Sequence, residues 1–222
     1  MPASTPVPAQ VVLFDGFDPL DVVGIYEVLH AGTLVGGPVV PELVSGEGPR
    51  TVVSGTPGIT LEAGAALDPD LPGYVVVPGA VGPVESAEGD ADTIPVLLAR
   101  FAQSAAMPLV RRALDNPGVT VATLCGGSVA LALAGLLEGR TAVTNAMGTD
   151  LLEATGVRVA DARVVDDGDL LSAGGVTSGL DLGIYVLERE AGPRVARSVE
   201  SIFEFERRGT VWADRGVEPR PL

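Results

Sequence analysis

Cysteine, histidine and positive charge are scarce in this chain. Its 222 residues include one cysteine, Cys125, and one histidine, His30. An internal disulfide is therefore excluded, as is a zinc site built from cysteine and histidine ligands, and we expect no metal. Lysine and arginine total 14 against 29 aspartates and glutamates, which gives a net charge of −15. Because nucleic acids and anionic lipids attract basic surfaces, we expect neither as a partner.

Long hydrophobic runs and a signal peptide are also missing. The longest apolar stretches, such as Val129–Ala134, are far too short to span a bilayer. The first ten residues carry three prolines and lack the basic and apolar regions of a signal peptide, so we expect a cytoplasmic protein. Hydrophobic residues nevertheless make up 46% of the chain, enough to bury a sizeable core, and the length fits one domain.

Short apolar runs alternate with helical patterns along most of the chain. The runs predict strands at 11–14, 39–44, 74–77, 119–124, 141–144, 158–165 and 170–173, with a hairpin over 51–61. Helices are predicted at 20–30 with Gly32 as the cap, 94–114 with a break near Pro108, 128–137, 149–154, 177–191 and 193–208. This alternation is typical of an α/β fold, a doubly wound, mainly parallel sheet sandwiched by helices. We predict a single domain over 1–222, with a flexible arm at 1–9 and an unpatterned tail at 209–222.

Cys125 lies where a candidate nucleophile is expected. In such sheets the site lies beyond the carboxyl ends of the strands, and Cys125 follows a buried strand directly. Gly126 and Gly127 allow a tight turn into the next helix, which directs the sulfur out of the sheet. The helix N-terminus favours the thiolate. Most lone cysteines are small buried hydrophobes, but this turn favours a nucleophile. Ser128 fits a helix N-cap better than a nucleophile.

A carboxylate is predicted to assist the sulfur. His30 lies at the far end of the first predicted helix, where it suits the helix dipole. Asp21 lies in the apolar frame LDVVG, so we expect it to be partly buried with a raised pKa. Its alternative role is the N-cap of that helix. Asp15 and Asp18 fit solvated turns.

Backbone N–H groups form the third candidate component. The loop after the strand at 74–77 contains Gly79 and Ala80. Its N–H groups, together with that of Gly126, could form a nest that stabilises an anion. The alternative is a plain turn.

Six motifs together resemble the ThiJ/PfpI superfamily, whose fold is like that of class I glutamine amidotransferases. They are FDGF and LDVVG within 14–24, VPGA at 77–80, CGGS at 125–128, AGLLEGR at 134–140 and GGVTSGLD at 174–181. Within the superfamily, the likeness is nearest to isocyanide hydratases and to the amidase-like domain of AraC-type regulators. The resemblance implies a flavodoxin-like sandwich with a small β-hairpin. It also implies a homodimer that acts on a small-molecule substrate without a cofactor or metal.

The resemblance implies a reaction as well. The Cys125 thiolate, on a strained elbow, would attack the terminal carbon of an isocyanide. The thioimidate formed would be hydrolysed to an N-substituted formamide, with Asp21 as the acid and base. The further pocket residues it implies are the backbone at Gly79, Ala80 and Gly126, together with Gly24 and Asn145, which stands where a histidine is common.

Two other functions remain open. A glyoxalase-type reaction on methylglyoxal usually needs a glutamate or histidine beside the sulfur, and Glu27 is the nearby candidate. A redox- or ligand-sensing domain would instead oxidise Cys125 to the sulfinate without turnover.

Overall fold

An eight-stranded sheet in the order β12-β10-β11-β7-β6-β1-β2-β5 forms the centre of the computed structural model, which describes residues 5–85 and 92–217. The strands are β1 (Val7–Leu13), β2 (Val39–Ser45), β5 (Ala65–Ala66), β6 (Gly73–Val77), β7 (Val119–Leu124), β10 (Val164–Asp166), β11 (Leu170–Ala173) and β12 (Trp212–Ala213). All neighbours are parallel except β10 and β11. The predicted α/β class is confirmed. The central strands are buried on both faces, which explains their unbroken apolar runs.

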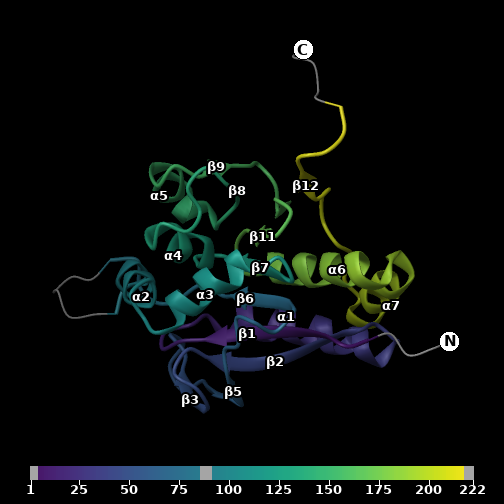
Figure 1. Cartoon of the computed structure of the whole chain (residues 1–222), viewed down its shortest axis with the longest axis horizontal. Helices are drawn as coiled ribbons and strands as arrows, with labels where there is room; N and C mark the ends of the chain where they lie inside the picture. Colours follow the sequence, from purple (N-terminus) through teal and green to yellow (C-terminus); the bar gives the residue numbers. More distant parts are fainter. Residues whose placement is uncertain (1–4, 86–91, 218–222) are drawn as a thin grey trace.

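Helices and two small strand pairs surround this sheet (Figure 1). The helices are α1 (Pro19–Leu34), α2 (Ile94–Phe101), α3 (Ala106–Asp115), α4 (Gly127–Leu133), α5 (Thr149–Ala154), α6 (Ser178–Ala191) and α7 (Pro193–Phe203), with a 3-10 turn η1 (Ala146–Gly148). The predicted hairpin is present as β3 (Arg50–Val53) with β4 (Thr60–Ala63), and β8 (Thr141–Ala142) pairs with β9 (Arg158–Val159). Within the described ranges, no helix combines the length and hydrophobicity needed to cross a membrane.

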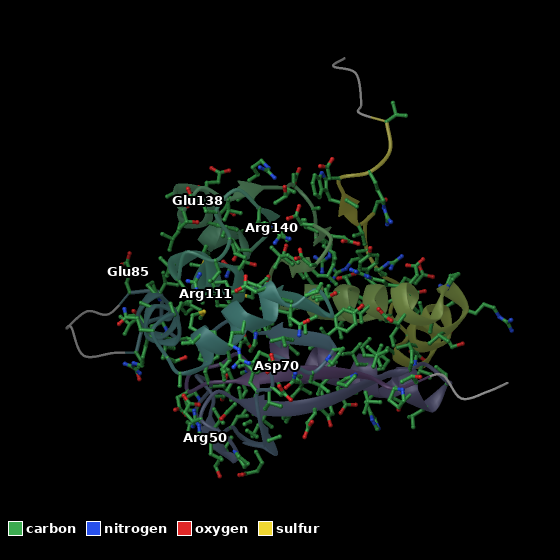
Figure 2. The ribbon with its side chains drawn as sticks, viewed as in Figure 1. Arg50, Asp70, Glu85, Arg111, Glu138 and Arg140 are labelled. Atoms are coloured by element: carbon green, nitrogen blue, oxygen red, sulfur yellow. The ribbon has the colours of Figure 1, made fainter. Side chains whose placement is uncertain are left out.

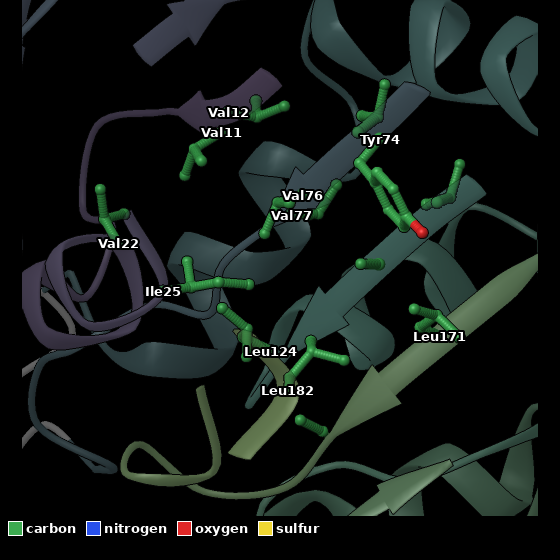
Figure 3. Packing of buried hydrophobic residues seen from close by; sticks show 14 of the residues in the cluster. Val11, Val12, Val22, Ile25, Tyr74, Val76, Val77, Leu124, Leu171 and Leu182 are labelled. Atoms are coloured by element: carbon green, nitrogen blue, oxygen red, sulfur yellow. The ribbon is translucent and has the colours of Figure 1, made fainter. Parts of the chain in front are cut away.

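Helices α1 and α6 pack closely against each other and the sheet. Figure 3 shows Ile25 of α1, Leu124 of β7 and Leu182 of α6 in the same buried cluster. Gly32 lies inside α1, where an added Cβ would come 2.4 Å from a methyl carbon of Leu187 on α6. The prediction that Gly32 caps this helix is therefore wrong, because its missing side chain serves the helix contact.

Three other predicted boundaries also differ from the structure. The arm expected at 1–9 ends earlier, because β1 begins at Val7 and pairs with β2 from that residue onward. The helical stretch breaks at residues 102–105 rather than at Pro108, which lies in the first turn of α3 where proline is tolerated. Part of the tail at 209–222 joins the sheet as β12 beside β10. Residues 1–4 and 218–222 lie outside the described part of the chain.

Ion pairs connect loops at the periphery. Arg140, labelled in Figure 2, donates to the Asp167 carboxylate and the Asp169 carboxylate, both at 2.5 Å. These contacts join the segment before β8 to the turn between β10 and β11.

A buried carboxylate on α6 holds two other segments. Arg163 donates to the fully buried Asp181 of α6 at 2.7 Å, and the Arg208 backbone N–H donates to the same carboxylate at 2.6 Å. The segment after α7 is thereby tied to α6.

Candidate active site

Cys125 occupies a strained turn between β7 and α4. Its φ of +51° lies in the left-handed region, which costs a non-glycine residue about 1–2 kcal/mol. Three hydrogen bonds hold this conformation. The Cys125 N–H donates to the carbonyls of Ala173 at 3.0 Å and Gly174 at 3.1 Å, and its own carbonyl accepts from Thr144 Oγ1 at 2.6 Å. The carboxyl end of β11 and Thr144, two residues after β8, therefore impose the turn.

The two glycines that follow allow close approach rather than a left-handed backbone. An added Cβ on Gly127 would come 2.3 Å from the Val77 carbonyl oxygen at the end of β6. One on Gly126 would come 2.9 Å from a methyl carbon of Leu98 on α2. Positive φ belongs to Cys125 itself, in agreement with the strained elbow that the resemblance implies. We call residues 125–127 the elbow.

Asp21 is fully buried in the first turn of α1. Its Oδ2 accepts the Gly79 N–H at 2.8 Å, whereas its Oδ1 has no hydrogen-bond partner within the described residues. Burial, reinforced by the nearby Asp18 carboxylate and opposed by the Gly79 N–H, raises the pKa of Asp21 to about 8. The predicted burial and upward shift are confirmed. The N-cap of α1 is instead Asp18, whose Oδ1 accepts the Leu20 N–H at 2.9 Å. Asp18 is buried, which corrects its assignment to a solvated turn.

Asp21 and Cys125 face each other across Gly79. A Cβ built on Gly79 would lie 3.0 Å from Asp21 Oδ2 and 3.0 Å from Cys125 Cβ, so the glycine leaves the space between them open. Burial and the negative charge of Asp21 raise the pKa of the Cys125 thiol to about 12. Desolvation thus opposes the thiolate that the helix N-terminus favours. The thiol needs a base.

Two donors are directed at the sulfur. Asn145 Nδ2 lies 3.1 Å from Cys125 Sγ, and the Gly126 backbone N–H also bonds to the sulfur. Both contacts oppose the rise in the thiol pKa. The Asn145 Oδ1 accepts the Gly148 N–H at 3.0 Å, which fixes the orientation of the amide. Thus the sequence-predicted residues Cys125, Asp21, Gly79, Gly126 and Asn145 meet in one place.

The loop after β6 is less open than expected. The Gly79 N–H, which we expected to face an anion, is bonded to Asp21, because a buried carboxyl oxygen needs a donor. Ala80 forms an antiparallel bridge with Phe17. The Gly79 carbonyl accepts the Asp18 N–H at 2.9 Å, which connects this loop to the start of α1. This loop therefore positions Asp21.

Four other residues from the sequence analysis lie elsewhere. Gly24 is on the side of α1 that faces α6, where an added Cβ would contact Leu180 at 3.6 Å. Ser128 is buried and donates to the Val143 carbonyl at 2.7 Å instead of capping α4, so its predicted N-cap role is wrong. His30 and Glu27 are exposed on α1, beyond Asp21 along the helix.

The strain at Cys125 gives a stability prediction. Cys125→Gly should be more stable than Cys125→Ala by about 1 kcal/mol, because glycine adopts φ of +51° freely. For this chain length the difference corresponds to roughly 2–4 °C in Tm, measurable by calorimetry. The matched control is Ala130→Gly inside α4, where the same loss of a methyl group should destabilise. Equal Tm values for the two Cys125 variants would contradict the strained turn.

Known proteins share this architecture and parts of this sequence. The profile of the DJ-1/PfpI family matches residues 8–189. Isonitrile hydratase of Pseudomonas putida is 30% identical over 199 residues, which cover 87% of this chain and 76% of the relative. The crystal structure of Drosophila melanogaster DJ-1beta superposes with a TM-score of 0.74 at 17% identity, covering 91% of this chain and all of DJ-1beta. An AraC family transcriptional regulator from Pseudomonas putida reaches 0.66 at 21% identity, covering 89% and 100%. By its sequence and fold, this chain belongs to the DJ-1/PfpI family.

Proposed function

We propose that this chain is a cysteine-dependent enzyme that hydrates isocyanides to N-substituted formamides. The observation that carries the proposal is the buried Asp21 carboxyl group beside Cys125, with its pKa raised to about 8 and one oxygen unpartnered in the described structure. A group with a pKa near the working pH can both accept and deliver a proton. The similarity to isonitrile hydratase of Pseudomonas putida supports the same reaction.

The first step adds the thiol across the isocyanide carbon. The Asp21 carboxylate removes the Cys125 proton, and the sulfur forms a bond to the terminal carbon. The protonated Asp21 then delivers that proton to the same carbon, which leaves a thioimidate, R–N=CH–S–Cys125. One proton must be shared by the two residues for this step, since a doubly protonated pair lacks a nucleophile.

The second step consumes one water molecule. Water adds to the carbon of the thioimidate C=N bond, and Asp21 passes one proton of that water to the nitrogen, which gives R–NH–CH(OH)–S–Cys125. When the carbon–sulfur bond breaks, Asp21 takes the hydroxyl proton of this tetrahedral adduct and delivers it to the departing sulfur, which releases R–NH–CHO and restores the thiol. Asn145 and the Gly126 N–H contact the sulfur and so stabilise the negative charge that it carries when it attacks and when it leaves.

The alternatives have less support at this site. A glyoxalase-type reaction usually needs a glutamate or histidine beside the sulfur, but Glu27 and His30 are exposed. A redox sensor needs a readily formed thiolate, but the pKa of the Cys125 thiol is raised to about 12.

The test is formation of N-cyclohexylformamide from cyclohexyl isocyanide by the purified protein. We expect multiple turnovers by the wild type and none above background by Cys125→Ala. Absence of turnover, with fast oxidation of Cys125 by peroxide, would favour a sensor. The homodimer suggested by the resemblance stays a prediction, to be tested by sedimentation velocity.

The pH dependence of kcat/KM gives a second test of the shared proton. Because the pKa of Asp21 is raised to about 8, the doubly protonated, inactive pair predominates below that pH. We expect kcat/KM to rise about tenfold per pH unit between pH 6 and 8 and to level off above. Asp18→Asn should shift this rise in kcat/KM to lower pH, because the Asp18 charge raises the pKa of Asp21. Asparagine can still cap α1, so the helix should be kept. If kcat/KM rose over the same pH range in Asp18→Asn, the assignment of this pH dependence to Asp21 would be contradicted.

A further inference from the structure

An apolar recess opens beside the elbow on the side of Asn145. It has a volume of about 310 Å³, near the lower end of the range typical of ligand pockets. Apart from Asn145 and Gly148, its wall is made of apolar side chains: Val84, Ile94, Pro95, Leu98, Val129, Leu133, Met147 and Leu151. None of the recess residues carries a charge, in a chain with a net charge of −15.

Two residues of the recess wall lie next to the elbow. Asn145 lines the recess, and its Nδ2 lies 3.1 Å from Cys125 Sγ. Leu98 also lines it, and its methyl carbon lies 2.9 Å from the position of a Cβ on Gly126. The recess therefore borders the elbow at Asn145 and Leu98.

Resting on the proposed function, we infer that this recess receives the substituent on the isocyanide nitrogen, and that the preferred substrates carry a bulky apolar group such as cyclohexyl or phenyl. Asn145 is the only hydrogen-bonding side chain of this wall within the described residues, and its amide is already bonded to the sulfur and to the Gly148 N–H. A carboxylate or hydroxyl group on the substituent would therefore lose its hydration without gaining a partner. Each methylene buried in the recess gains affinity instead.

The size and polarity of the substituent should set kcat/KM. We expect cyclohexyl isocyanide to exceed methyl isocyanide by at least about 30-fold, and isocyanoacetate to react no faster than methyl isocyanide. Leu151→Gln changes a residue at the rim that is 43% exposed, and glutamine is a good helix former, so α5 should remain folded. It should lower kcat/KM about tenfold for the cyclohexyl substrate and less than twofold for the methyl substrate. The control is Ile202→Gln on α7, which is 55% exposed and outside the recess, and it should change neither.

A second readout does not depend on isocyanide hydration. We would compare the alkylation rates of Cys125 by N-cyclohexylmaleimide and N-methylmaleimide, each normalised to the rate with glutathione. A preference of about tenfold for the cyclohexyl reagent, reduced in Leu151→Gln, supports binding of the apolar group in the recess. If this preference is seen but no isocyanide is hydrated, only the proposed function fails. Equal kcat/KM for methyl and cyclohexyl isocyanide, with equal alkylation rates, would contradict the assignment of the recess to the substituent. The proposed hydratase function would be unaffected. An equal loss of kcat/KM for both substrates in Leu151→Gln, together with a change in oligomeric state, would also contradict this assignment. A second copy of the chain would then cover this surface.

Discussion

Replacing Asp21 by asparagine is expected to lower kcat/KM for an isocyanide about 10³-fold while making the folded protein more stable at alkaline pH. An amide cannot take the Cys125 proton, whose removal is demanding because the pKa of that thiol is raised to about 12. General acid–base groups typically contribute about 10²–10⁴-fold to the rate. The side chain keeps its shape, and its amide oxygen can still accept the Gly79 N–H.

The gain in stability follows from the position of the Asp21 pKa. In the folded protein the pKa of Asp21 is raised to about 8, whereas an aspartate in the unfolded chain titrates near its ordinary pKa of 3.8. Between these pH values the folded state holds a proton that the unfolded state has lost, so the free energy of unfolding of the wild type falls as pH rises through this window. The asparagine variant has no such penalty. Above pH 8 the penalty reaches at most about 6 kcal/mol, from 1.36 kcal/mol per pKa unit.

Thermal unfolding at pH 5 and pH 9 checks this expectation. The Tm of Asp21→Asn should exceed that of the wild type by about 10 °C or more at pH 9, and by clearly less at pH 5. The control is Asp15→Asn, which changes an exposed carboxylate in the loop that precedes α1, and it should keep both activity and Tm. An Asp21→Asn variant with more than a tenth of wild-type kcat/KM would refute the proton-transfer role of Asp21.

The second large effect is expected from a single methyl group at the elbow. Gly127→Ala should destabilise the protein by about 3 kcal/mol, because the new Cβ would come 2.3 Å from the Val77 carbonyl and 2.9 Å from the Pro78 carbonyl. Glycine to alanine in a helix ordinarily stabilises, so the predicted sign is the reverse of the usual one. The backbone of β6 and the elbow must separate, which moves Cys125 away from Asp21.

Gly126→Ala provides the neighbouring control. Its Cβ would meet only the methyl end of Leu98, which can rotate away. We expect a loss below about 1 kcal/mol for Gly126→Ala, against a fall in Tm of roughly 6–12 °C for Gly127→Ala. Equal Tm changes in the two variants would show that the backbone clash at Gly127 is not decisive.

The parts of the fold and site that depend on local patterns could be predicted from the sequence. Buried strands such as β7 are continuous apolar runs, and their carboxyl ends meet at one edge, which placed Cys125 and the Gly79 loop together. The apolar neighbours of Asp21 correctly indicated a buried carboxyl group. Asn145 was a candidate only through the resemblance, because nothing local marks it as a partner for the sulfur.

The rest depends on contacts between distant segments. The sequence pattern predicts a helix end at Gly32, but this residue lies inside α1. Glycine is needed there because Leu187 of α6 occupies the space that a side chain would fill. The left-handed turn falls on Cys125 and not on the glycines, since carbonyls at residues 173 and 174 hold its N–H. The raised pKa of the Cys125 thiol could not be predicted, because desolvation is a property of the whole fold. Short-range patterns contain none of these three contributions.

The order of the large sheet also bears on aggregation. Its two outermost members, β12 and β5, contain two residues each, Trp212–Ala213 and Ala65–Ala66. An outer strand with a long row of unpaired N–H and carbonyl groups can recruit strands from other molecules, whereas a very short one offers few bonds to a newcomer. The longer strands β2 and β10 are shielded over part of their outer edges by these short partners. The architecture that brings an acid and a thiol together thus also discourages edge-to-edge polymerisation into fibrils.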